Sequence, residues 1–156
     1  MEQRINVLEK GGRAIKALYG LGIYLAKSPV EQPLLNLIYF RVSQMNGCAN
    51  CLDMHSKDLR ARGESEQRLY VLEAWREAPF YTDRERAALG WAEAVTKVAG
   101  GNVPDVVYDE TIKYFSEEEL IDLTIAVITI NSYNRINIAF NVKAGNYQPG
   151  QYAVEA

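Results

Sequence analysis

Apolar residues recur along most of this chain at spacings of three and four, which is the period of an α-helix. The first such stripe comprises Ile5, Leu8, Gly12, Ile15, Tyr19 and Gly22. Pro29 and Pro33 then interrupt the pattern, and Pro33 suits the first turn of a second helix. The second segment runs to about Gly47 and is apolar nearly all round, which indicates a buried helix.

Capping and helix-breaking residues divide the middle of the chain into further helices. Glycine suits the position just past a helix end, so a third helix is expected from Cys48 to Gly63. Ser65 can cap a fourth helix, which Pro79 ends. That fourth helix carries Leu69, Leu72 and Trp75.

Two of the later helices begin at capping boxes, in which Ser or Thr pairs with Glu three residues on. Thr82 with Glu85 and Ser116 with Glu119 fit this pattern. A further helix is expected between them, starting at Pro104, and the helix from Ser116 runs to about Ala144. An irregular tail is expected from about Asn146.

These signals together predict an all-α fold. No segment alternates apolar and polar residues as a half-buried strand does, and the connections between the expected helices are short. We find no internal repeat, low-complexity segment or linker that divides the chain. The sequence therefore predicts one helical domain over residues 1–156, with about six to eight helices.

Composition narrows the class of partner. The 156 residues include 17 Lys and Arg against 20 Asp and Glu, so the formal net charge is −3, which offers no basic surface for nucleic acid. The apolar window at 123–130 is too short to span a bilayer, and the opening residues 1–4 do not resemble a signal peptide. We expect a cytoplasmic protein without a membrane or nucleic-acid partner.

The chemically special residues of the chain lie within eight positions of one another. The chain has two cysteines, Cys48 and Cys51, and one histidine, His55. If a helix begins here, Cys48 lies near its N-cap and Cys51 in its first turn, where unpaired backbone N–H groups favour a thiolate. His55 follows Cys51 by one turn on the same helix face, within reach of its sulfur directly or through one water.

Ionisation of the thiol alone gives little reactivity. Lowering a thiol pKa from ~8.5 to ~6.5 raises the thiolate fraction at pH 7 about 25-fold, while a Brønsted slope of about 0.45 lowers nucleophilicity about 8-fold. The net gain is about threefold. A peroxidase therefore also needs an acid that protonates the departing oxygen, and Cys48 and His55 are the candidates.

Three other interpretations of this cluster remain open. A thioredoxin-like site requires a βαβ context, which the sequence lacks. A structural zinc site normally has four ligands, and the cluster supplies only three. The three residues could also be ordinary core residues. A disulfide over so short a loop adds little stability, which favours redox or metal chemistry over a structural role.

Around this cluster the sequence resembles the alkylhydroperoxidase D family within the carboxymuconolactone decarboxylase superfamily. The match is carried by Arg41–Lys57, which contains the Cys-Ala-Asn-Cys-Leu-Asp-Met-His motif, and extends over about residues 33–140. It continues through Arg68–Tyr70, Ala74–Arg76, Thr82–Leu89 and Ser116–Phe140.

The resemblance implies an all-helical homo-oligomer, a trimer or a hexamer, that reduces peroxides with thiols and no bound cofactor. By position, Cys51 corresponds to the cysteine that becomes a sulfenic acid, and Cys48 to the partner that donates a proton and closes the disulfide. His55 corresponds to the proton-relay histidine. The partners implied are a hydroperoxide and a protein dithiol that supplies electrons.

One position departs from the family pattern. The family often has a glutamate twelve residues before the first cysteine, and this chain has Asn36 there. Asparagine can hold a relay water but cannot accept a proton. Asp53 and Glu31 are the carboxylates that could replace it. Asp53 is expected to face solvent, whereas Glu31 could reach the site only through a favourable turn.

Three functions follow from the sequence. The first is a thiol peroxidase or disulfide reductase. The second is a lyase of the carboxymuconolactone decarboxylase type, whose chemistry does not need two cysteines, and the third is a non-catalytic redox sensor. Trp75 and Trp91 are expected to be core or subunit contacts. The helix from Ser116 is apolar around much of its circumference, which predicts an oligomer contact.

Overall fold

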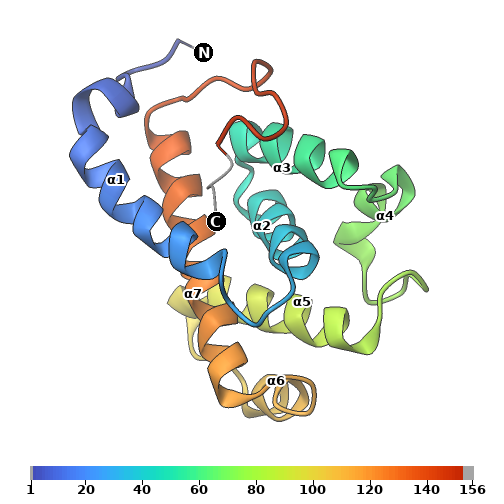
Figure 1. Cartoon of the computed structure of the whole chain (residues 1–156). Helices are drawn as coiled ribbons and strands as arrows, with labels where there is room; N and C mark the ends of the chain where they lie inside the picture. Colours follow the sequence, from blue (N-terminus) through green and yellow to red (C-terminus); the bar gives the residue numbers. More distant parts are fainter. Residues whose placement is uncertain (1, 153–156) are drawn as a thin grey trace.

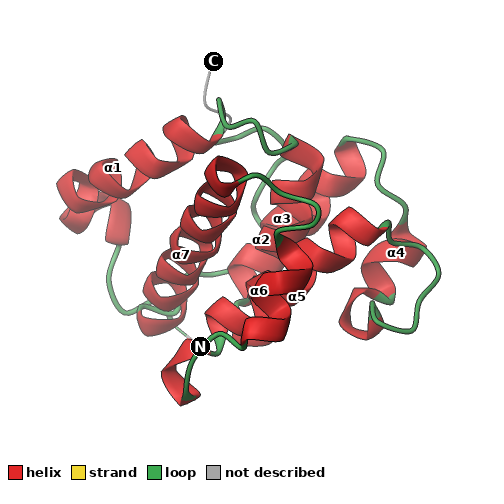
Figure 2. Cartoon of the chain, turned by 90° about the horizontal axis from the view of Figure 1, so that it is seen from below, coloured by secondary structure: helices red, strands yellow, loops and turns green. Residues whose placement is uncertain are grey.

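The computed structural model describes residues 2–152 and contains seven α-helices and two short 3-10 helices in that range (Figure 1). No strand occurs in the same range (Figure 2), so the predicted all-α class is confirmed. The elements are α1 Val7–Leu25, α2 Gln32–Asn46, α3 Ala49–Ala61, α4 Glu66–Tyr70, η1 Leu72–Ala74, α5 Asp83–Thr96, η2 Val98–Gly100, α6 Asp105–Thr111 and α7 Glu117–Ala139.

The central element is α2, which packs against α3, α5 and α7. Its side chains are buried nearly all round, as the sequence predicts. The centre of the core combines residues of α2, α5 and α7, among them Leu35, Ile38, Val42, Leu89, Leu123 and Val127. The first helix, α1, packs on the outer side of α7 (Figures 1 and 2).

A glycine at the end of α2 creates the turn that starts α3. Gly47 has a left-handed backbone with φ 67°, a conformation that glycine adopts without a steric cost. The chain reverses there, and the Cys48 amide donates to the Ser43 carbonyl at 3.1 Å. Cys48 is thereby placed at the N-cap of α3. Both predicted capping boxes are also present, Thr82 with Glu85 and Ser116 with Glu119.

The fourth helix is shorter than the sequence predicts. It ends at Tyr70 and is followed by the 3-10 turn η1, whereas continuous helix was expected up to Pro79. Tertiary contacts replace the missing helical hydrogen bonds: the Arg86 guanidinium donates to the Trp75 carbonyl at 2.9 Å and to the Arg76 carbonyl at 3.1 Å. Helix propensity, which depends on neighbouring residues in the sequence, cannot predict hydrogen bonds from a side chain of another helix.

The last helix also ends early, at Ala139 instead of about Ala144. Asn141 has a positive φ of 53°, and the Val142 amide donates back to the Asn137 carbonyl at 2.9 Å, which closes the helix. The tail therefore begins earlier than expected and folds back over α3. Asn50 donates to the Lys143 carbonyl at 2.8 Å, and Lys57 donates to the Tyr147 carbonyl at 3.1 Å.

Among residues 2–152, none of the helices is long and apolar enough to cross a lipid bilayer.

Candidate functional site

The two cysteines form a disulfide at the start of α3. Cys48 is the N-cap residue and Cys51 lies in the first turn, where the sequence places them. Their Cα atoms are 5.4 Å apart, and the residues are 1% and 0% exposed. The bond is thus held inside the protein at the end of a helix whose free N–H groups stabilise negative charge. A cysteine at this position is favoured as a thiolate once the disulfide opens.

The single histidine lies one turn along α3 and is buried. Neither ring nitrogen of His55 has a hydrogen-bond partner among the described residues. Burial lowers the pKa of His55 to about 4, because the charged ring loses its hydration. His55 is therefore neutral at pH 7 and keeps one N–H donor and one acceptor nitrogen. Its ring also packs against the ring of Tyr39 on α2, with 5.4 Å between centroids.

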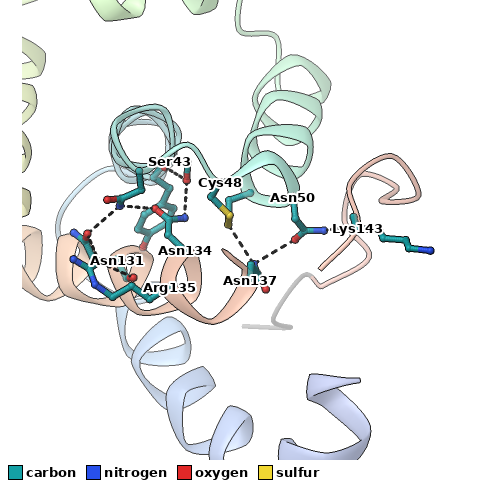
Figure 3. Close-up of a disulfide and its surroundings, with 11 residues drawn as sticks. Ser43, Cys48, Asn50, Asn131, Asn134, Arg135, Asn137 and Lys143 are labelled. Atoms are coloured by element: carbon teal, nitrogen blue, oxygen red, sulfur yellow. Dashed lines mark hydrogen bonds between the residues drawn. A yellow bond between two sulfur atoms is a disulfide. The ribbon is translucent and has the colours of Figure 1, made fainter. Parts of the chain in front are cut away.

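Asn137, which the sequence does not single out, contacts the sulfur of Cys51. The Asn137 amide, on α7, donates to the Cys51 Sγ atom at 3.2 Å and to the Asn50 Oδ1 atom at 3.3 Å (Figure 3). A hydrogen bond to sulfur is stronger when the sulfur is anionic. Asn137 is therefore placed to stabilise a Cys51 thiolate.

Asn137 is the last of three asparagines on the side of α7 that meets α2 and α3 (Figure 3). Asn46 donates to the Oδ1 atoms of Asn131 and Asn134, at 3.0 and 2.8 Å. Asn134, 0% exposed, donates in turn to Ser43 Oγ at 3.0 Å. The sequence does carry a signal for this row, namely amide residues spaced by three within an apolar helix. What it cannot show is which helix they face.

A cavity of about 440 Å³ opens beside His55. It lies between α1, α2, α3 and α7, with Tyr152 of the tail at its edge. We call it the tyrosine cavity because its walls combine apolar residues with Tyr19, Tyr39, Tyr133 and Tyr152. Burial raises the pKa of Tyr39 and of Tyr133, so both phenols stay neutral at physiological pH. The cavity suits an uncharged organic molecule.

A second cavity, of about 400 Å³, reaches the disulfide at Cys48. We call it the tail cavity, because it is formed by the start of α3, the end of α7 and the tail. Its lining residues are Gly47, Cys48, Ala49, Asn50, Asn137, Ile138, Asn141, Val142, Lys143 and Ala144. Asn50, Asn137 and Val142 line both cavities and form the wall between them.

Asn36 lies inside α2, 9% exposed, and its amide donates to the Gln32 carbonyl one turn back at 2.7 Å. It is not among the residues that line either cavity. Its role as a proton relay stays a prediction. On the same helix, Tyr39 is the residue whose ring touches His55.

The two carboxylates that could replace a relay glutamate are engaged elsewhere. Lys57, at 2.9 Å, and the Gly145 amide hold Asp53 and lower its pKa. Arg84 binds Glu31 at 2.9 Å and lowers its pKa. Both carboxylates are therefore ionised at pH 7. The contacts of Asp53 fasten the tail to α3, and those of Glu31 join α2 to α5.

The two tryptophans are buried among core residues, as expected. Trp75 donates from its ring nitrogen to Glu93 at 2.9 Å, and Trp91 donates to Thr124 at 2.9 Å. Glu93 also binds Arg41 at 2.8 Å, which compensates the burial of that charge. In the part of the chain that the structure describes, no group of three or more His, Cys, Asp or Glu side chains is placed to hold a metal ion.

Comparisons with known proteins show which family the sequence matches and which proteins share its fold. Residues 11–94 match the Carboxymuconolactone decarboxylase family. The chain is 40% identical over 146 residues to the uncharacterized protein YdfG of Bacillus subtilis strain 168, and the alignment covers 94% of this chain and 99% of that one.

Several solved structures share the fold, and two of them differ widely in their identity to this chain. One is a protein of unknown function from Agrobacterium tumefaciens, named as a candidate antioxidant defence protein AhpD, with a TM-score of 0.89 and 40% identity over 94% of this chain and all of that chain. The other is the debrominase Bmp8, with a TM-score of 0.79 and 23% identity over 89% of this chain and 75% of that chain. At that lower identity the second likeness concerns the fold alone.

Proposed function

Because the chain belongs to the carboxymuconolactone decarboxylase family, we propose that it is an alkylhydroperoxidase D-like oxidoreductase that reduces organic hydroperoxides with its cysteine pair. The observation that carries the proposal is the Cys48–Cys51 disulfide at the start of α3, one turn from a buried, neutral His55. Two sulfurs that can bond to each other, and an imidazole that can pass a proton, are the groups that a two-cysteine peroxidase requires.

The first step consumes the hydroperoxide. The Cys51 thiolate attacks the terminal oxygen of the hydroperoxide, the O–O bond breaks, and Cys51 becomes a sulfenic acid. The departing alkoxide takes a proton from the Cys48 thiol or through His55 and leaves as an alcohol. The α3 N-terminus and the Asn137 amide, 3.2 Å from the Cys51 sulfur, favour the thiolate that starts the step.

The second step closes the disulfide. The Cys48 thiolate attacks the Cys51 sulfur, the S–O bond breaks, and hydroxide leaves as water after it takes a proton through His55. The net reaction converts a hydroperoxide and two thiols to an alcohol, water and a disulfide. A dithiol donor then reduces the disulfide and restores both thiols.

The tyrosine cavity supports an organic hydroperoxide as the substrate. It lies beside His55 and Asn137, and its apolar and phenolic walls can bury the organic group of the peroxide while the O–O end faces the site. Hydrogen peroxide leaves most of that volume unused. We therefore infer that hydroperoxides with a bulky apolar group react faster than hydrogen peroxide does.

Two cysteine variants test the proposal. Cys51→Ser is expected to abolish hydroperoxide reduction, because the attacking sulfur is gone. Cys48→Ser is expected to allow one turnover at most and to leave a sulfenic acid on Cys51, which dimedone labelling and mass spectrometry detect. Ser56→Ala, on the same helix, is the control and keeps activity. A sulfenic acid found on Cys48 in Cys51→Ser, with none on Cys51 in Cys48→Ser, would reverse the two roles.

A further inference from the structure

We propose that the reducing thiol reaches the disulfide through the tail cavity and attacks Cys48, so that Cys51 leaves as the thiolate. The hydroperoxide and the reductant then approach the cysteine pair through different cavities. This inference rests on the proposed function, because it assigns the reductive half of the same cycle.

The two cavities reach different parts of the site. Cys48 lines the tail cavity and is absent from the lining of the tyrosine cavity. His55 lines the tyrosine cavity and is absent from the lining of the tail cavity. Because Cys48 is only 1% exposed, an attacking sulfur has to enter the tail cavity itself to reach it.

A hydrogen-bonded bridge separates the two routes. Asn50 donates to the Lys143 carbonyl of the tail at 2.8 Å and accepts from Asn137 at 3.3 Å, and Asn137 reaches Cys51 at 3.2 Å. The bridge thus runs from the tail, through α3 and α7, to the buried sulfur (Figure 3). It lies between the two cavities, since Asn50 and Asn137 line both. A small thiol in the tail cavity therefore meets Cys48 first.

The same bridge determines which sulfur leaves. Thiol–disulfide exchange is faster when the leaving sulfur has the lower pKa. Both cysteines lie at the N-terminus of α3, which stabilises a thiolate on either of them. Asn137 donates its hydrogen bond to Cys51 Sγ alone, so negative charge is stabilised more on Cys51 than on Cys48. Attack at Cys48 expels this stabilised thiolate. Attack at Cys51 would expel Cys48 and would also require the thiol to pass the bridge.

The thiol–disulfide exchange needs no reagent other than the donor thiol. A donor thiolate attacks Cys48 Sγ, the Cys48–Cys51 bond breaks, and its electron pair stays on Cys51 as a thiolate. The product is a mixed disulfide between the donor and Cys48. A second donor thiol attacks the donor sulfur of that mixed disulfide and releases the oxidised donor and the Cys48 thiolate, which takes a proton from water.

The position of the mixed disulfide tests the regiochemistry. The full chain is oxidised with diamide, mixed with 2-mercaptoethanol for milliseconds, quenched in acid and alkylated with iodoacetamide. Peptide mass spectrometry is expected to find the mercaptoethanol adduct on Cys48 and the alkyl group on Cys51. An adduct on Cys51 at the earliest times would overturn the inference. Because diamide forms the disulfide, this result does not depend on any hydroperoxide activity.

A pair of cavity-filling variants tests the two routes. Ala144 lines only the tail cavity and Val7 only the tyrosine cavity. Ala144→Trp is expected to slow reduction by 2-mercaptoethanol at least tenfold while oxidation by cumene hydroperoxide keeps its rate. Val7→Trp is expected to slow oxidation and to leave reduction unchanged. Circular dichroism checks that both variants fold, and Ala144→Ser and Val7→Ala serve as the small-residue controls.

The outcomes separate this inference from the proposed function. If both tryptophan variants slow the same half-reaction, or if Ala144→Trp leaves reduction unchanged, the two-route inference is wrong and hydroperoxide reduction stands. If the reduced protein does not react with cumene hydroperoxide at all, the proposed function is wrong, whereas the adduct position still reports on the route of the thiol.

Discussion

The Asn137 amide donates a hydrogen bond to the Cys51 sulfur across 3.2 Å, and so joins the last helix to the first turn of α3. A hydrogen bond to a charged group contributes about 1.5–3 kcal/mol. The amide therefore favours the thiolate of the reduced Cys51 over its thiol.

Asn137→Leu is expected to raise the pKa of the Cys51 thiol, because the thiolate loses this donor, and to slow its oxidation at pH 7 several-fold. The pH dependence of iodoacetamide labelling, in a Cys48→Ser background, measures that pKa. Asn131→Leu is the matched control, because Asn131 bonds Asn46 and Thr96 and does not contact the cysteines. Equal effects of the two substitutions on the pKa of Cys51 would contradict a specific role for Asn137.

His55 is expected to titrate near pH 4 in the disulfide form, because burial lowers its pKa from the usual 6.5 to about 4. It is the only histidine of the chain, so its imidazole gives a single set of NMR signals that can be followed from pH 3 to 8. A value near 6.5 would show that the ring is hydrated and not buried.

The lowered pKa of His55 also affects stability. Between about pH 4 and 6.5 the unfolded chain binds a proton that the folded chain does not, so the free energy of unfolding rises with pH in that window and falls on acidification. At pH 4 the loss from this group is about 3 kcal/mol. The free energy of unfolding in urea, measured for the wild type and for His55→Gln at pH 4 and 7, isolates the contribution of His55. A pH dependence that is identical in the two proteins would contradict the assignment.

Replacement of Asn36 tests the predicted proton relay. Asn36→Glu introduces the carboxylate that the alkylhydroperoxidase D pattern often has at this position, and general-base assistance contributes ~10²-fold when well placed. Because a buried carboxylate has a raised pKa, about a tenfold faster oxidation of Cys51 is expected. Stopped-flow rates with an alkyl hydroperoxide from pH 5 to 9 measure the effect. Asn36→Gln, which adds length without a base, is the control and should give no gain. An unchanged rate in Asn36→Glu would place the relay elsewhere.

Exposed isoleucines on α7 predict a homo-oligomer, and the resemblance to the alkylhydroperoxidase D family implies a trimer or a hexamer. Ile121 is 63% exposed and Ile128 is 46% exposed, and they lie two turns apart on one side of the helix. Ile121→Glu combined with Ile128→Glu is expected to reduce the mass measured by light scattering to that of a monomer. Val106→Glu, at a position 72% exposed on α6, is the control and should leave the mass unchanged. A wild-type protein that is monomeric at micromolar concentration would contradict this prediction.

Local signals in the sequence predict the framework of the site well. Gly47 and the four-residue spacing from Cys51 to His55 are short-range features, and they determine where α3 begins and which face carries the imidazole. The two capping boxes determine in the same way where α5 and α7 begin. The Asn137 contact could not be predicted in this way, because it depends on how α7 packs against α3. The end of α4 was missed for the same reason, since Arg86 of α5 supplies the bonds that replace helix there.

The most direct test of a catalytic cysteine pair is the amount of hydroperoxide consumed per chain, with and without a dithiol. Fully reduced protein is mixed with a tenfold excess of cumene hydroperoxide, and the alcohol formed and the free thiols left are counted together. Without dithiol, the account predicts one alcohol per chain and the loss of both thiols, with Cys48 and Cys51 joined. With excess dithiothreitol, corrected for its own reaction with the hydroperoxide, it predicts many alcohols per chain. Two alkylatable thiols after treatment, or one alcohol per chain even with the dithiol present, would contradict it.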